Sequence, residues 1–144
     1  MSETIYLVGT IGDCSVAIPA DHVEAVVRIG EVIPAPAAPP SVRGLVAIRS
    51  RILTLIDSCK VVGETSCDTG FMAIVSIDGH GYGLMLDLVE DVVALGALRP
   101  APSGLTAGWA RLAPKMCDHR GRVVLVVEPA ALISAAADVL AEVA

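Results

Sequence analysis

The sequence is poor in aromatic residues and in positive charge. Its aromatic side chains are Tyr6, Phe71, Tyr82 and Trp109, and its 10 lysines and arginines are outnumbered by 16 aspartates and glutamates, for a net charge of −6. A nucleic-acid-binding surface needs clustered cations and often stacking rings, so this composition argues against nucleic acid as a ligand. Protein partners are the better expectation.

Long apolar segments are also missing, although the mean hydropathy is high at +0.70. The longest charge-free stretches, Val32–Val42 and Ala101–Ala110, are interrupted by proline or glycine, whereas a membrane-spanning helix needs about 20 apolar residues. The first residues, Met1–Ile5, lack the basic start and apolar core of a secretory signal. We therefore expect a cytoplasmic protein with no direct membrane insertion.

Recognisable catalytic and metal-binding motifs are absent as well. The cysteines form no C-x-x-C pair, so in a reducing compartment we expect buried thiols at Cys14, Cys59, Cys67 and Cys117. The run Cys117–His119 holds three possible metal ligands, but adjacent residues in a turn rarely point at one ion. No histidine belongs to a nucleophile–base motif. We predict no enzyme, metal or cofactor; a small ligand- or metal-binding β-barrel that uses Cys14, Cys117 or His119 is the alternative.

The apolar residues occur in short runs rich in Val, Ile and Leu, separated by Gly, Asp and Pro. This pattern is typical of strands and turns and predicts a mainly β protein. Gly12-Asp13 and Asp78-Gly79 predict tight hairpin turns, because these residues tolerate positive φ. The predicted strands are Thr4–Ile11, Ser15–Ile18, Leu45–Ile48, Arg51–Ile56, Phe71–Ile77, Tyr82–Leu86 and Arg122–Val127.

The chain also resembles itself. Ile5–Val27 aligns without a gap on Phe71–Val93, and Arg49–Asp57 aligns on Arg120–Glu128. Any two β-hairpins share some of this pattern, but the preserved order of both segments favours two tandem β units, roughly residues 1–66 and 67–144. A unit of about 70 residues buries little surface alone, so the two units should pack into one cooperative body.

Three other segments carry structural expectations. Ile33–Pro40 is too rich in proline for a strand and predicts a loop, either a connector or a strap that docks on an aromatic groove. Pro129–Val143 predicts an amphipathic helix that packs on the sheet. The arginines Arg43, Arg49 and Arg51 form either a solvated basic face, an internal anchor or a site for an acidic partner.

The segment Ala38–Asp57 resembles the central signature of the CheW-like chemotaxis coupling proteins. That signature has a proline-rich approach, a fixed glycine, an arginine, and an apolar strand that ends on aspartate; Gly44, Arg49 and Asp57 match it in spacing. Ala47 and Ser50 stand where the family has asparagine and glycine. The glutamate that partners the arginine in the family falls at Ala25, next to Glu24.

The resemblance implies a single domain over residues 1–144, built from two small SH3-like five-stranded β-barrels on a shared core with a C-terminal helix at about 129–143. Strands can be exchanged between the two lobes. Such a protein is a non-catalytic adaptor that couples the cytoplasmic tip of a methyl-accepting chemotaxis receptor to the regulatory domain of a CheA-type histidine kinase, at membrane-associated receptor arrays. By position, the implied kinase- and receptor-interaction residues are Val23, Glu24, Gly44, Ile48, Arg49 and Asp57.

The departures at Ala47 and Ser50 favour a second possibility within the same signalling class. A diverged member of the family would bind the kinase or another signalling partner without normal receptor coupling.

Overall fold

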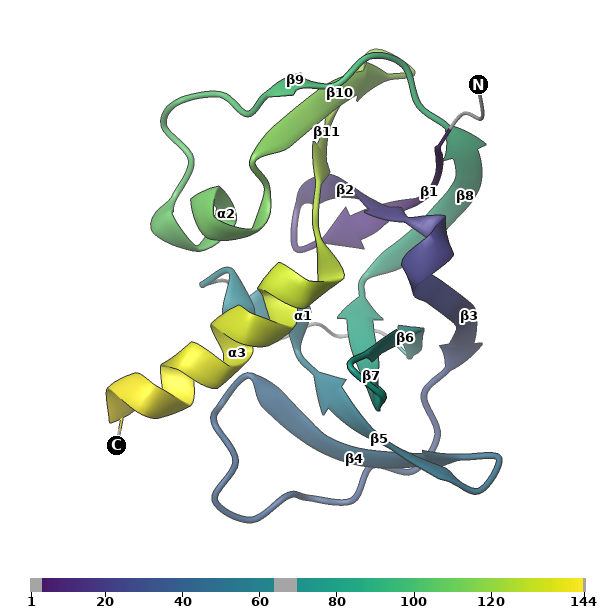
Figure 1. Cartoon of the computed structure of the whole chain (residues 1–144), viewed down its shortest axis with the longest axis vertical. Helices are drawn as coiled ribbons and strands as arrows, with labels where there is room; N and C mark the ends of the chain where they lie inside the picture. The colour runs from purple at the N-terminus through teal and green to yellow at the C-terminus, as the bar shows by residue number, and fades with distance from the viewer. Residues whose placement is uncertain (1–3, 64–69, 144) are drawn as a thin grey trace.

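The short apolar runs form two sheets, seen in the upper and lower halves of the computed structural model in Figure 1, which describes residues 4–63 and 70–143. The six-stranded sheet has the order β8-β1-β2-β11-β10-β9 and the five-stranded sheet the order β3-β6-β7-β5-β4. Neighbouring strands are antiparallel except for the pairs β2–β11 and β5–β7, which are parallel. The mainly β fold class is confirmed.

The strand bounds follow the apolar runs closely. β5 (Arg51–Ile56) and β6 (Phe71–Ile77) have the predicted limits, and the Gly12-Asp13 and Asp78-Gly79 turns close the β1–β2 and β6–β7 hairpins. The remaining strands are β1 (Ile5–Ile11), β2 (Cys14–Pro19), β3 (Val23–Arg28), β4 (Val42–Ile48), β7 (His80–Leu86), β8 (Leu88–Ala94), β9 (Arg99–Pro100), β10 (Lys115–His119) and β11 (Arg122–Val126).

The internal repeat is visible in the topology. The hairpin β1–β2 corresponds to β6–β7, β3 corresponds to β8, and β4–β5 corresponds to β10–β11. Each sheet joins the first hairpin of one repeat to the later strands of the other. The boundary near residue 66 falls between β5 and β6, which belong to one sheet, so the sheets do not follow the two halves of the sequence.

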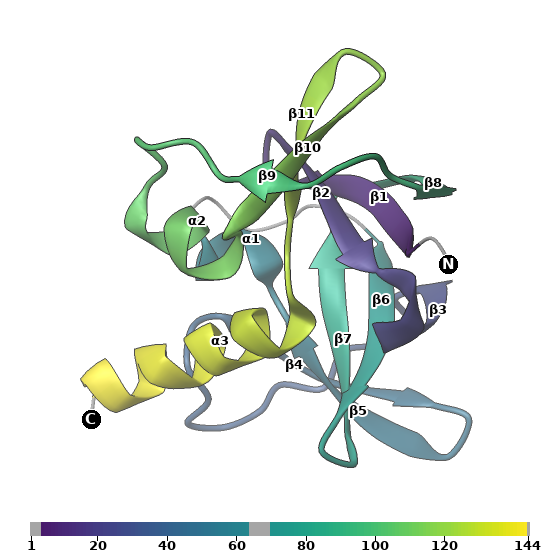
Figure 2. The ribbon, with the colours of Figure 1, turned by 45° about the horizontal axis from the view of Figure 1, so that its top comes forward.

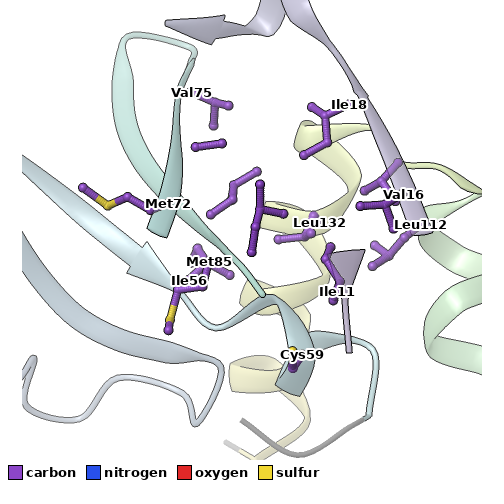
Figure 3. Close-up of a cluster of buried hydrophobic side chains, with 14 of the residues drawn as sticks. Ile11, Val16, Ile18, Ile56, Cys59, Met72, Val75, Met85, Leu112 and Leu132 are labelled. Atoms are coloured by element: carbon purple, nitrogen blue, oxygen red, sulfur yellow. The ribbon is translucent and has the colours of Figure 1, made fainter. Parts of the chain in front are cut away.

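Each sheet defines one lobe of the molecule. The five-stranded lobe is the continuous segment Val23–Leu86, and the six-stranded lobe combines β1–β2 with β8–β11. Both lobes contribute to one hydrophobic cluster, shown in Figure 3. Ile11 and Val16 reach it from the six-stranded sheet, Met72 and Met85 from the five-stranded sheet, and Leu132 from the C-terminal helix. The lobes therefore share a core and stabilise each other.

The helices lie against this core. α3 (Pro129–Val143) has the predicted bounds and packs against α1 (Ser58–Val61) and α2 (Ala107–Leu112), as Figure 2 shows. A short 3₁₀ turn at Ala20–His22 joins β2 to β3. The proline-rich segment forms a loop apart from one bridge between Ile33 and Leu45. No helix among the described residues is long and apolar enough to cross a membrane.

The cysteine prediction holds only in part. Cys14 and Cys117 are thiols outside any disulfide, and Cys117 is buried whereas Cys14 is only partly buried. Cys59 is also buried, but it is disulfide-bonded, so the expectation of a thiol there is wrong. Cys67 lies outside the described residues. Cysteine spacing alone does not reveal such a bond, because pairing depends on the distance between Cα atoms in the folded chain.

Candidate functional site

The first feature of the candidate site is a β-bulge at Glu24. In the β3–β6 pairing, Val23 lies opposite Val75 and Ala25 opposite Ile74, so Glu24 is an extra residue with no partner. Bulges bend a strand and redirect a side chain. Here the Glu24 carboxylate accepts a hydrogen bond from Arg51 at the start of β5, with a nitrogen–oxygen distance of 2.7 Å. The ion pair links two strands that are not neighbours in the sheet.

The second feature is the turn between β4 and β5. Ile48 pairs with Arg51, so Arg49 and Ser50 form the two-residue turn, with φ values of 46° and 71°. Positive φ at both central residues matches the type I′ turn that suits the twist of hairpin strands. A side chain in this conformation is strained, and Ser50 carries one where glycine would not be strained.

These two features line a pocket of about 220 Å³, which we call the Arg49 pocket. Its wall combines ionic and aliphatic side chains: Glu24, Ala25, Val27, Ile48, Arg49, Arg51 and Ile74. Three residues expected at the interaction site, Glu24, Ile48 and Arg49, therefore come together. Within the part of the chain that the structure describes, Arg49 makes no hydrogen bond or ion pair.

The six-stranded lobe contains the equivalent constellation. Glu90 is the bulge residue of β8, since Val8 faces Asp91 and Gly9 faces Val89. The Arg122 guanidinium donates to the Glu90 carboxylate at 2.6 Å and holds the pKa of Glu90 below its usual range. This pair corresponds by the repeat to Glu24 and Arg51.

A second ion pair in the six-stranded lobe has no counterpart among the described residues of the five-stranded lobe. Arg120, equivalent to Arg49, lies 3.5 Å from the carboxylate of Asp91. The residue equivalent to Asp91 is Ala25, which has no carboxylate to offer Arg49. Among the described residues, Arg49 therefore has no carboxylate from β3, because position 25 is alanine and Glu24 is engaged by Arg51.

The other three expected residues lie away from this pocket. Val23 begins β3 and packs, half-buried, against the core. Gly44 is buried in β4, where a Cβ would stand 2.5 Å from the carbonyl oxygen of Ile33. Gly44 therefore allows the proline-rich loop to pair with β4.

Asp57 is fully buried at the end of β5 and caps α1. Its Oδ1 accepts the backbone N–H of Lys60 at 3.3 Å, and its Oδ2 lies 3.8 Å from the Arg43 guanidinium. Its own N–H donates to the carbonyl of Ser41 at 2.7 Å. Asp57 thus fastens the end of the proline-rich loop to the lobe.

The comparisons with known proteins agree with this architecture. The family model of the CheW-like domain matches residues 6–137, almost the whole chain. The chain belongs to the CheW-like family. Members of this family are non-catalytic scaffolds in chemotaxis, so no catalytic role is assigned to the protein.

The fold of this CheW-like chain is similar to that of a solved structure. The scaffolding protein TtCheW from Thermoanaerobacter tengcongensis superposes with a TM-score of 0.77 over 88% of this chain and 89% of that one, at 19% sequence identity. The search of the curated proteins finds no match.

The metal-binding alternative gains no support from geometry. Cys117–His119 lies in strand β10, not in the expected turn, so its side chains alternate between the two faces of the sheet. Burial raises the pKa of the Cys117 thiol, and Asp118 is paired with Arg99. Among the described residues, no three His, Cys, Asp or Glu side chains gather into a possible metal site.

Arg51 and Ala25 line the pocket but are not among the interaction residues predicted from the sequence. The internal repeat contained a signal for both. Aligning the two halves places Ala25 on Asp91 and Arg51 on Arg122, and it identifies Arg49 as the arginine whose carboxylate has been lost.

Proposed function

We propose that this CheW-like chain is an adaptor that couples a methyl-accepting chemotaxis receptor to the regulatory domain of a CheA-type histidine kinase. The observation that carries the proposal is the gathering of Glu24, Ile48 and Arg49 around one pocket beside the β4–β5 hairpin. The family membership supplies the class of function, and this site supplies a surface for it.

The β4–β5 hairpin is the face that we assign to the kinase. β4 is an edge strand of the five-stranded sheet, and Ile52 on the adjacent β5 is 61% exposed. Edge strands and exposed aliphatic side chains favour docking of another β-domain. The receptor's helical tip is the second partner, bound elsewhere on the molecule. We place the complex on the cytoplasmic side of receptor arrays, where many modest interfaces assemble cooperatively.

Binding to the isolated regulatory domain of a cognate CheA-type kinase tests the proposal. Ile52→Asp should weaken this binding about tenfold or more, because a buried carboxylate replaces an apolar contact. The repeat provides a matched control in Val123→Asp, since Val123 occupies the equivalent position in β11 and is 47% exposed. That variant should bind like the wild type.

The measurement is isothermal titration calorimetry, with circular dichroism as a check on folding. Absence of wild-type binding to both the regulatory domain and a soluble receptor fragment would refute the adaptor function. Equal affinities of Ile52→Asp and Val123→Asp would show that the kinase does not bind at the β4–β5 hairpin. Gly44→Lys is not a suitable interface variant, because any side chain at Gly44 collides with Ile33.

The diverged regulator is a second candidate, favoured by the strained Ser50 turn and by the missing carboxylate at Ala25. Such a protein would bind the kinase without supporting receptor-controlled activity. Receptor stimulation of kinase activity in a reconstituted array that contains this chain would rule it out.

A further inference from the structure

We propose that the Arg49 pocket receives a carboxylate from the protein partner, an aspartate or glutamate side chain of the kinase regulatory domain. The inference rests on the proposed function and adds to it the residue chemistry of the contact. In this interpretation, the partner supplies in trans the carboxylate that Ala25 does not supply in cis.

The six-stranded lobe serves as an internal template. There the same bulge, the same glutamate–arginine pair and the same turn arginine are present, and the turn arginine Arg120 is neutralised by Asp91 at 3.5 Å. The five-stranded lobe has every part of this arrangement except the carboxylate. The backbone therefore already presents Arg49 in a position from which a guanidinium reaches a carboxylate.

Arg49 is the cation of the pocket that is available to a partner. Arg51 is held by Glu24 at 2.7 Å, whereas Arg49 is exposed and unpaired among the described residues. A guanidinium binds a carboxylate with two parallel hydrogen bonds, which gives direction as well as energy. The pocket volume of about 220 Å³ leaves room for such a side chain.

The lining also limits which anion fits. Glu24 contributes a negative charge to the wall, and the chain carries a net charge of −6. A doubly charged phosphate or an extended acidic tract would be repelled, whereas a single carboxylate would be balanced by Arg49. Val27, Ile48 and Ile74 line the rest of the pocket and would cover the methylene groups of the partner's side chain.

The kinase regulatory domain is the proposed source of the carboxylate because Arg49 is continuous with the surface assigned to the kinase. Arg49 lies in the turn of the same β4–β5 hairpin that presents Ile52, the residue assigned above to the kinase contact. A carboxylate of the regulatory domain that docks against the hairpin would therefore meet Arg49 within the same interface.

Two substitutions test the proposal against the regulatory domain by titration calorimetry. Arg49→Gln removes the cation, and Ala25→Asp restores the internal carboxylate of the other lobe. Each should weaken binding about tenfold, because each denies the partner's carboxylate its charged donor. Asp91→Ala, the converse change in the six-stranded lobe, is the matched control and should leave binding unchanged.

Ala25→Asn separates charge from bulk, since asparagine has nearly the volume of aspartate and no charge. It should bind more tightly than Ala25→Asp. Equal loss with both substitutions, or wild-type affinity of Arg49→Gln, would overturn the carboxylate contact while leaving the adaptor function intact. If Arg49→Gln and Ala25→Asp weaken binding to a soluble receptor fragment but not to the regulatory domain, the kinase is not the source of the carboxylate. No binding by the wild type would refute the proposed function itself.

Discussion

Ser50 has a backbone conformation that favours glycine and strains any other residue. It holds φ at 71° in the β4–β5 turn, and the equivalent position of the β10–β11 turn is occupied by Gly121 at 77°. An L-residue in the left-handed region costs about 1–2 kcal/mol relative to glycine, which adopts it freely. The two repeats thus adopt the same turn with different residues, and Ser50 adds strain at the second turn position that Gly121 avoids.

We therefore expect Ser50→Gly to raise the free energy of unfolding by about 1 kcal/mol and the Tm by roughly 2–4 °C. Gly121→Ser is the matched change in the other lobe and should lower stability by a similar amount. Urea unfolding followed by circular dichroism measures both. A neutral or destabilising Ser50→Gly would mean that the serine side chain compensates the strain.

The candidate site shows what single residues reveal before the fold is known. The arginines of the hairpin and the neighbourhood of Glu24 and Ala25 could be picked out from the sequence. The ion pair between Glu24 and Arg51 could not be predicted from the sequence. The bulge at Glu24 directs its side chain to Arg51, and sequence spacing alone assumes a regular strand register, which a bulge shifts. The sequence also does not reveal that Gly44 and Asp57 are buried, because both lie against the proline-rich loop and its end, whose position depends on the folded structure.

At the scale of the elements, the strands that were not predicted share a cause. β3 and β8 each contain a bulge, neither strand has a fully buried residue, and in both a charged residue interrupts the apolar run. In β10, Met116 and Cys117 are adjacent and polar or charged residues flank them on both sides, so its apolar run is only two residues long. Strand prediction depends on unbroken alternation or dense apolar runs, and these strands have neither.

The C-terminal helix was predicted because its apolar spacing is regular, and the structure gives it a structural role. Leu132 is fully buried in the shared cluster, whereas Ser134 in the same helix is exposed. Leu132→Ala should lower the free energy of unfolding by about 3 kcal/mol through lost burial and a cavity, and Ser134→Ala should change it by less than about 0.5 kcal/mol. Equal effects in urea unfolding would show that α3 is not anchored by Leu132.

At the scale of the whole molecule, the exchange of strands between the repeats is the feature that sequence comparison leaves open. The repeat shows which strands are equivalent, but equivalent strands have equivalent edges, so β1 could in principle accept either β3 or β8. In the structure β1 pairs with β8, and β3 pairs with β6. The short 3₁₀ turn after β2 carries β3 into the other lobe, and burial of side chains in the shared cluster stabilises this exchanged pairing of the strands.

The shared cluster leads to the last prediction, that the two lobes unfold in one step. The five-stranded lobe is continuous in sequence, yet separation would expose Met72 and Met85 on one side and Ile11 and Val16 on the other, each side chain losing about 1.5–3 kcal/mol of burial. Trp109 is 4% exposed within this cluster, so its fluorescence reports the junction, while far-UV circular dichroism reports both sheets. The two urea transitions should coincide, and Ile11→Ala should shift both by the same amount. A fluorescence change at lower urea than the loss of strand signal would instead show that the lobes separate before they unfold.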